Sequence, residues 1–377
     1  MLLEILQTAG GAGNSMWYWI ITTIIWLAAI YMYQEFYYIQ RPLWQIGGFL
    51  SYLGQMIRGA SADIGSHMEK LKRPEVQRKD VDEVIRRMLD FTVIPPTSLD
   101  PFGIVPKYKN ILDAYETSSE AEVRRIIGDN AVSVKNVSTA LEALRGINYL
   151  YKIVDHYYRI AKKYKLYVYA MQLSMLLPLL KEASDALNGA VSAFIKGLPV
   201  GDSAGPLVAF NVIRSCQNAV LHDGVKDTAV VECDLEGRRL YIVKARGPGS
   251  TVGRPDEGVQ YVIEKLGVRP KYIITVDAAL KLEGEKTGEI AEGVGVAMGG
   301  IGAEKFNIET IATKHNVPLY AFLIKMREAE ALTAMTKEIY DSVQTVSGRV
   351  LDFIRGKVSP SEAVILVGVG NTVGVAQ

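Results

Sequence analysis

This chain of 377 residues has little cysteine, little histidine and no excess of either charge. The spacing of its two cysteines, Cys216 and Cys233, matches neither a zinc site nor a disulfide framework, which favours a reducing compartment. The four histidines lie far apart, and none belongs to a metal-binding motif such as HExxH. With 42 basic and 41 acidic side chains, the net charge of +1 gives no general attraction to nucleic acid, so no nucleic-acid partner is expected.

Charged side chains are also absent from residues 5–34, where an apolar and aromatic run occupies residues 16–33. At a rise of 1.5 Å per residue, about eighteen helical residues span roughly 27 Å, close to the hydrocarbon thickness of a bilayer. A cleaved signal peptide is the main alternative, but it requires basic residues upstream, where Glu4 is the only charged side chain. The pattern therefore predicts a transmembrane helix within an N-terminal segment, residues 1–40.

Lysine and arginine occur only downstream of this run, from Arg41 onward. Because basic residues near a span stay in the cytoplasm, we expect a single-pass protein of the cell membrane with its N-terminus outside and its C-terminal domain cytoplasmic. Residues 41–80 are interpreted as a basic juxtamembrane linker, whose charges would contact the lipid bilayer. Within this linker, residues 43–57 are either an interfacial segment lying on the membrane or ordinary linker.

Residues 81–197 carry helical periodicity and are expected to form a helical subdomain. The predicted elements are a short helix at 81–89, a proline-rich loop at 95–106, and helices through most of 118–196, with a capping box at Ser119 and Glu122. The apolar stretch 166–180 is short for a second span and contains Gln172 and Pro178, which favours a buried core helix.

After residue 197 the pattern changes to buried strands that alternate with helices. Strands are predicted at 240–245, 272–276, 319–324 and 364–369, and helices at 207–213, 256–266, 307–315 and 329–354. Because crossover helices join parallel strands, residues 198–377 are expected to form an α/β domain with a mostly parallel sheet flanked by helices. Ligands in such sheets bind beyond the carboxyl ends of the strands.

Three glycine-rich turns, at 247–253, 293–299 and 368–374, share the spacing GxGxxxG. Glycine lets a backbone approach a ligand closely and leaves N–H groups free for an anion, although tight packing turns use glycine equally well. The spacing departs from the Walker and dinucleotide patterns, so the cofactor stays unknown. The candidate cofactor-binding residues are Gly247, Gly249, Gly253, Gly293, Gly295, Gly368, Gly370 and Asn371.

Two aspartates are the candidate catalytic residues. Asp202 lies in a turn before the predicted helix 207–213, where it either caps that helix or faces a cleft. Asp277 follows the predicted strand 272–276 at its carboxyl end. Two carboxylates brought together share a proton, so one can activate water as a base while the other serves as an acid. A divalent metal is an open addition to this scheme, but no metal ligands are assigned.

At these residues the stretch 199–326 resembles the spore germination proteases and the related hydrogenase maturation proteases. The motifs are, in order, Gly-Asp-Ser-Ala-Gly-Pro at 201–206, the turn 247–253, Val-Asp-Ala-Ala-Leu at 276–280 and the loop 293–302. The resemblance implies a phosphorylase/hydrolase-like fold, a protein or peptide substrate, and catalytic roles for Asp202 and Asp277. Pro-Asp-Glu-Gly-Val at 255–259 is similar to the acidic motif of the maturation proteases, but that alternative alignment loses the register of both aspartates.

Those families begin with a strand that ends Gly-Leu-Gly-Asn just before the first aspartate. Here a helix precedes Asp202, and Ile-Leu-Val-Gly-Val-Gly-Asn stands at 365–371, near the C-terminal end. We therefore hypothesise a circular permutation, which requires Asn371 to lie beside the two aspartates.

Over its whole length the chain also resembles an archaeal family of membrane-anchored proteins with no assigned activity. Together these observations predict a membrane-anchored, cytoplasmic-facing hydrolase of peptidase type that uses paired aspartates. The alternative is a non-catalytic, membrane-tethered binding or regulatory protein whose glycine-rich loops hold a small ligand.

Overall fold

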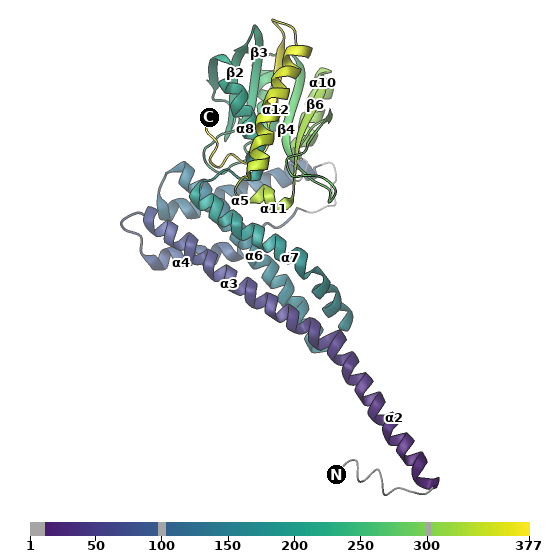
Figure 1. Ribbon diagram of the computed structural model, residues 1–377. Helices are drawn as coiled ribbons and strands as arrows, with labels where there is room; N and C mark the ends of the chain where they lie inside the picture. Colours follow the sequence, from purple (N-terminus) through teal and green to yellow (C-terminus); the bar gives the residue numbers. More distant parts are fainter. Residues whose placement is uncertain (1–11, 97–102, 299–302) are drawn as a thin grey trace. The chain divides into compact units, whose positions relative to one another are not determined.

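The structure, a computed structural model, describes residues 12–96, 103–298 and 303–377 (Figure 1). The predicted features at Pro101 and at the end of the loop 293–302 lie outside the described residues. The chain divides into two compact units. Unit 1 comprises residues 1–55 and 149–181, and unit 2 comprises residues 56–148 and 182–377.

Unit 1 contains the predicted span. Helix α2, Ala12–Glu35, continues through the π-helix η1, Phe36–Gln40, into helix α3, Arg41–Leu71. Within the helical stretch Met16–Leu71, an 18-residue window has a mean hydropathy of 1.4, and none of this window is buried. Within the described ranges, one helix, near the N-terminus, is long and apolar enough to cross a membrane, as predicted.

The segment after the span is helical. Helix α3 occupies most of it, and Ile46 and Leu53 on this helix are fully buried, so residues 43–57 are not an irregular connection. Gly47 on this helix faces Tyr158 of helix α6, Ala131–Tyr164, since an added Cβ would lie 3.8 Å from the Tyr158 hydroxyl oxygen, an ordinary van der Waals contact.

The rest of unit 1 comes from two helices that continue into unit 2, α6, Ala131–Tyr164, and α7, Tyr167–Lys196. The apolar stretch 166–180 lies almost entirely in α7, but it is not a buried core helix. Ala170 and Leu173 are buried, whereas Met175 and Leu179 are 75% and 65% exposed. Length and hydropathy alone could not distinguish these two outcomes, because exposure depends on the neighbours that a helix finds.

Unit 2 also contains the helices α4, Arg78–Asp90, and α5, Ile104–Ile127, which share an apolar core with parts of α3, α6 and α7. The predicted helix 81–89 is present as α4. The predicted capping box is wrong, because Ser119 lies inside α5. Helix α5 begins just before Pro106, whose missing N–H needs no acceptor in the first turn of a helix.

A seven-stranded sheet with the order β1-β2-β3-β7-β4-β6-β5 forms the centre of the remainder of unit 2. Its strands are β1, Gln217–His222; β2, Thr228–Leu235; β3, Arg238–Ala245; β4, Pro270–Leu280; β5, Ile290–Val294; β6, Leu319–Met326; and β7, Ala363–Gly368. The four predicted strands are β3, β7, β4 and β6, and they are parallel to one another.

The prediction of a mostly parallel sheet is wrong, because β1, β2 and β5 pair antiparallel with their neighbours. These are the strands that the sequence pattern did not show. The β2–β3 hairpin turns at Glu236 and Gly237, whose φ angles of 55° and 83° suit a two-residue hairpin loop. Strands β1 and β5 lie at the two edges and are largely exposed, so they lack the apolar run of a central strand.

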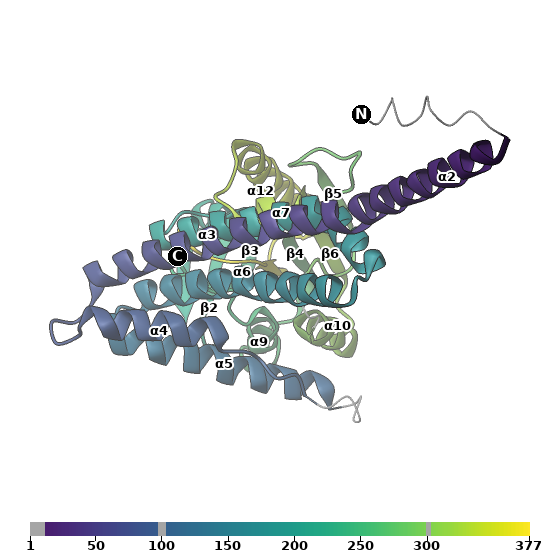
Figure 2. The ribbon, with the colours of Figure 1, turned by 90° about the horizontal axis from the view of Figure 1, so that it is seen from below.

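Helices cover both faces of the sheet, as predicted (Figure 2). Helices α8, Ala204–Arg214, and α12, Lys337–Lys357, pack on one face, and α9, Pro255–Gln260, with η3, Tyr261–Lys265, and α10, Ala303–His315, pack on the other. Side chains alternate accordingly along β3, since Ile242 faces the first layer and Val243 the second. The predicted helix 329–354 is two helices, α11, Glu328–Leu332, and α12.

The two cysteines are paired, contrary to the expectation from their spacing. Cys216 and Cys233 form a disulfide with their Cα atoms 5.8 Å apart. The turn from α8 into β1 returns the chain beside β2, so tertiary pairing rather than local spacing brings the two sulfur atoms together. The spacing argument for a reducing compartment therefore loses its basis.

Candidate functional site

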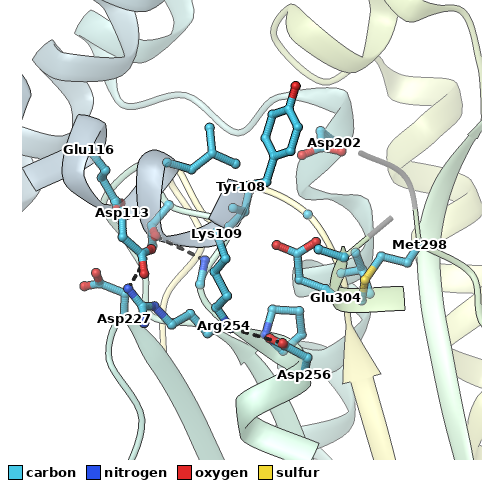
Figure 3. A pocket seen from close by; sticks show the side chains of 18 of the residues that line it. Tyr108, Lys109, Asp113, Glu116, Asp202, Asp227, Arg254, Asp256, Met298 and Glu304 are labelled. Carbon is cyan, nitrogen blue, oxygen red and sulfur yellow. Dashed lines mark hydrogen bonds and ion pairs between the residues drawn. The ribbon is translucent and has the colours of Figure 1, made fainter. Parts of the chain in front are cut away.

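The carboxyl edge of the parallel strands opens into a cavity of about 630 Å³ within unit 2 (Figure 3). The ends of β4 and β7, the segment 251–256 after β3 and the start of α10 form the sheet side of the cavity. Helices α5 and α6 contribute the opposite wall, with Tyr108, Lys109 and Asp113 from α5. The site therefore combines side chains from the helical part and from the sheet part of the unit.

Asp202 lies in the short 3₁₀ turn η2, Gly201–Ser203, directly before α8. Its side chain does not cap that helix; instead, its Oδ2 atom accepts a hydrogen bond of 2.8 Å from the backbone N–H of Asn371. Burial raises the pKa of the Asp202 carboxyl, and the hydrogen bond from Asn371 opposes this shift. Asp202 therefore faces the cavity.

Asp277 lies within β4, three residues before the strand ends at Leu280. It is only 4% exposed, and its Oδ1 atom accepts a hydrogen bond of 2.7 Å from the backbone N–H of Ala278. Asp277 lines the same cavity as Asp202. The structure thus brings the two aspartates to one cavity, although Asp277 lies inside β4 and not, as predicted, after the end of the strand, because β4 continues to Leu280.

Backbone contacts connect the two aspartates. The N–H of Val369 donates to the carbonyl of Val276 over 2.9 Å, next to Asp277. A Cβ on Gly370, the residue after Val369, would lie 2.0 Å from the carbonyl oxygen of Asp202. The end of β7 therefore lies between β4 and the turn η2, and it fixes both aspartates relative to the sheet.

Two of the candidate cofactor-binding glycines line this cavity. Gly253, with a φ of 63°, and Gly370, with a φ of 128°, both adopt backbone conformations that favour glycine. Gly247 and Gly368 instead pack tightly against other parts of the chain. Added Cβ atoms there would lie 1.8 Å from the carbonyl oxygen of Val375 and 2.6 Å from that of Gly205.

The other candidate cofactor-binding residues lie at separate places in the structure. Gly249 packs against Lys135 of α6. Gly293, on the exposed edge strand β5, and Gly295, just after it, are not among the residues that line the cavity. Asn371 lines a second cavity of about 420 Å³, whose walls include Asp202 and Glu142. The turns 247–253 and 368–374 therefore meet at the site, whereas the turn at 293–299 reaches the cavity through Met298 and not through Gly293 or Gly295.

Glu142 of α6 lines both cavities, as Asp202 does. Burial raises the pKa of the Glu142 carboxyl, the nearby Arg145 lowers it, and Glu116 and Glu120 raise it further. The guanidinium of Arg145 lies 4.7 Å from the centroid of the Tyr115 ring and is hydrogen-bonded to the Tyr115 hydroxyl. Glu142 thus adds a third carboxyl group to the site, and like Asp202 it lines both cavities and has a raised pKa.

Ion pairs join α5 to the start of α9. The ammonium nitrogen of Lys109 lies 3.2 Å from a carboxylate oxygen of Asp256 and 2.7 Å from one of Glu257. Arg254 reaches back to Asp113 of α5 over 2.8 Å. Burial lowers the pKa of Lys109, but its two carboxylate partners outweigh this effect, and the pKa is raised overall.

The cavity lining is strongly acidic, with eight carboxyl side chains and three basic ones. The acidic residues are Asp113, Glu116, Glu142, Asp202, Asp227, Asp256, Asp277 and Glu304, and the basic residues are Lys109, Arg145 and Arg254. Two of the three basic residues, Lys109 and Arg254, are already held in ion pairs. Among the described residues, no group of three or more His, Cys, Asp or Glu side chains is arranged to hold a metal ion.

The sequence did not identify the residues that α5 and α6 contribute. Lys109, Asp113 and Glu116 recur at intervals of four and three residues, which places them on one face of α5. Such a charged face is typical of a helix exposed to solvent. Only the tertiary structure shows that this face covers the carboxyl edge of the sheet.

Two family profiles match the chain over almost its whole length. Residues 20–197 match "Protein of unknown function (DUF1512) N-terminal domain", and residues 200–376 match "Domain of unknown function (DUF1512) C-terminal". A search of curated proteins found no match. These results give neither an archaeal source nor a protease relationship, so both stay predictions. The chain belongs to the DUF1512 family.

Proposed function

We propose that this protein is a membrane-anchored hydrolase that cleaves peptides in the acidic cavity of unit 2. The observation that carries the proposal is the convergence of Asp202 and Asp277 on one cavity at the carboxyl edge of the sheet. Paired carboxyl groups with different protonation states supply both an acid and a base for hydrolysis.

The environments of the two aspartates suggest their roles. The raised pKa of Asp202 means that it keeps its proton at a pH where an exposed aspartate is ionised, which suits an acid that protonates the leaving amine. Asp277 then accepts a proton from the attacking water. The scheme uses these side chains alone, and a divalent metal enters none of its steps.

The charge of the lining indicates the class of substrate. Without Asp202 and Glu142, whose pKa values are raised, six carboxyl groups still face three basic groups, so the field inside the cavity favours a positively charged ligand. We therefore propose peptides that bring a lysine, an arginine or a free amino terminus to the cavity.

The location and the fold are further parts of the proposal. Basic residues occur only after the apolar helix, which supports a cytoplasmic C-terminal domain and an outside N-terminus in the cell membrane. The hydrogen bond from Asn371 to Asp202 supports the phosphorylase/hydrolase-like fold in circularly permuted form, since it places the C-terminal strand end beside the first aspartate.

The test is hydrolysis by the purified full-length protein in detergent micelles. Peptides of equal length with positive, neutral and negative net charge are incubated with it at mildly acidic and neutral pH, and products are separated by mass. We expect cleavage of the positive peptides first. The variant Asp352→Asn, a surface change far from the carboxyl edge, should cleave them as fast as the original protein. Absence of cleavage for every peptide would contradict the proposal.

A non-catalytic binding role in the same cavity is the second candidate. The observation that favours it is the set of ion pairs by which α5 contacts the start of α9 at the cavity, since a ligand could strengthen or break them. Saturable binding of a positive peptide without any product would support this role over hydrolysis.

A further inference from the structure

The turn between α6 and α7 in unit 1 exposes an unusual number of apolar and aromatic side chains. Tyr164, Leu166, Tyr167 and Val168 are between 39% and 61% exposed. Contiguous exposed apolar surface of this kind on a soluble domain marks a contact with a protein or a membrane. We refer to residues 162–169 as the α6–α7 tip.

The tip is fixed beside the end of the predicted span (Figure 1). The ammonium nitrogen of Lys165 lies 3.0 Å from a carboxylate oxygen of Glu35, the last residue of α2. An apolar cluster of Leu43, Ala161 and Ala170 holds the same region together. Because residues 16–33 would fill the hydrocarbon layer, Glu35 and the tip would both lie at the level of the lipid headgroups.

The charge and chemistry of the tip match that level of a bilayer. Lys162 and Lys163 are exposed, and each lies over a tyrosine ring, Tyr158 at 5.8 Å and Tyr164 at 5.1 Å. Tyrosine is enriched at membrane interfaces, and lysine near an anionic leaflet is attracted by its surface potential.

We propose that the α6–α7 tip is a second membrane contact, in which the aromatic and aliphatic side chains enter the interfacial layer and the lysines bind anionic lipid headgroups. The inference rests on the membrane anchor of the proposed function but not on hydrolysis. The contact would restrain the end of α2 in two ways. The helix continues into α3 through the chain itself, and the tip is bound to Glu35 by an ion pair.

Amide hydrogen exchange of the full-length protein in nanodiscs tests this contact. The first N–H groups of a helix lack intrahelical acceptors, so those of Tyr167, Val168 and Tyr169 report directly on shielding by lipid. We expect them to exchange about thirtyfold more slowly in discs that contain phosphatidylserine than in phosphatidylcholine discs, the combined effect expected of two lysines at an anionic surface.

Matched variants separate lipid binding from other causes. Lys162→Glu with Lys163→Glu should abolish the difference between the two kinds of disc. Lys196→Glu with Lys357→Glu changes the net charge equally at other exposed positions and should preserve it. Equal exchange in both kinds of disc for the original protein would overturn the proposal.

Two exposed apolar residues further along α7 allow a test of whether a second copy of the chain, and not lipid, covers the tip. Met175 and Leu179 begin roughly 10 Å beyond Val168, outside the tip. A second copy of the chain, and not lipid, would cover the tip if two results were found together. The slow amide exchange of the tip would require two copies of the protein per disc, and it would be lost in the variant Met175→Asp with Leu179→Asp. Both results together would show that the lipid contact is wrong. Failure of the original protein to enter nanodiscs would overturn the anchor itself, whatever its hydrolytic activity.

Discussion

The backbone N–H of Asn371 donates a 2.8 Å hydrogen bond to the carboxylate of Asp202, although 169 positions separate the two residues. This bond ties the end of the C-terminal strand β7 to the turn that begins α8. It also opposes the rise that burial causes in the pKa of the Asp202 carboxyl. The pKa of Asp202 therefore depends on the docking of the chain's last segment.

The first prediction concerns stability and pH. Burial raises the pKa of Asp202 above its ordinary value of 3.8, so the folded protein binds this proton more tightly than the unfolded chain does. The contribution of Asp202 to stability is therefore complete below about pH 4 and falls as the pH rises through the folded pKa. Asp202→Asn cannot ionise and keeps an oxygen acceptor for Asn371.

Thermal unfolding of both proteins across pH measures this effect. We expect the melting temperature of Asp202→Asn minus that of the original protein to increase as the pH rises above about 4. Asp352→Asn, a surface change, should show no such trend. A difference that shrinks with rising pH would mean that Asp202 is ionised and stabilised in the fold.

The second prediction concerns the ion pairs of α5. Lys109→Met leaves Asp256, which is 3% exposed, with Asn307 as its remaining hydrogen-bond donor among the described residues. An uncompensated buried charge costs about 3 kcal/mol, so the free energy of unfolding in urea should fall by about that amount.

Adding Asp256→Asn to Lys109→Met removes the buried charge and should recover most of the lost stability. The control is the single variant Asp256→Asn in the original protein. If Asp256→Asn lowers the free energy of unfolding by the same amount in Lys109→Met as in the original protein, the two residues act independently. That result would show that the account of this ion pair is wrong.

The third prediction concerns the packing that positions the aspartates. A Cβ on Gly205 would lie 2.2 Å from the carbonyl oxygen of Val369 and 2.4 Å from that of Val276. Gly205→Ala must therefore displace α8 from the ends of β7 and β4, and we expect a loss of about 3 kcal/mol in the free energy of unfolding.

Gly348→Ala is the matched control, since Gly348 is exposed within α12 and no atom lies within 4 Å of an added Cβ. Alanine in a helix should stabilise this variant by roughly 0.5–1 kcal/mol. Similar free energies of unfolding for the two variants would show that α8 does not pack closely against the ends of β7 and β4.

The sequence predicted the central strands because buried parallel strands are continuous apolar runs, as at 364–369. It missed β1 and β5 because edge strands expose most of their side chains and carry no such run. It also missed β2, a largely buried strand whose apolar residues are interrupted by Glu232 and Asp234. The error in sheet type follows directly, since the three missed strands are the antiparallel ones. Continuous apolar runs thus identified the central parallel strands alone.

The candidate site was predictable to a similar extent. Asp202 and Asp277 follow from the rule that strand ends and adjoining turns carry functional groups. Glu142 and Lys109 were not predictable, because a charged helix face has the same pattern whether it meets water or a cavity. The glycines of 247–253 show the same ambiguity, since Gly247 packs against the chain and Gly253 lines the cavity.

The most direct test of the proposed hydrolase is a double-mutant cycle on peptide cleavage by the full-length protein. Residues that act as one unit are not additive, so Asp202→Asn and Asp277→Asn should each lower the rate by at least about 100-fold, and the double variant should be no slower than the worse single variant. Cleavage at an undiminished rate by either single variant would contradict the account.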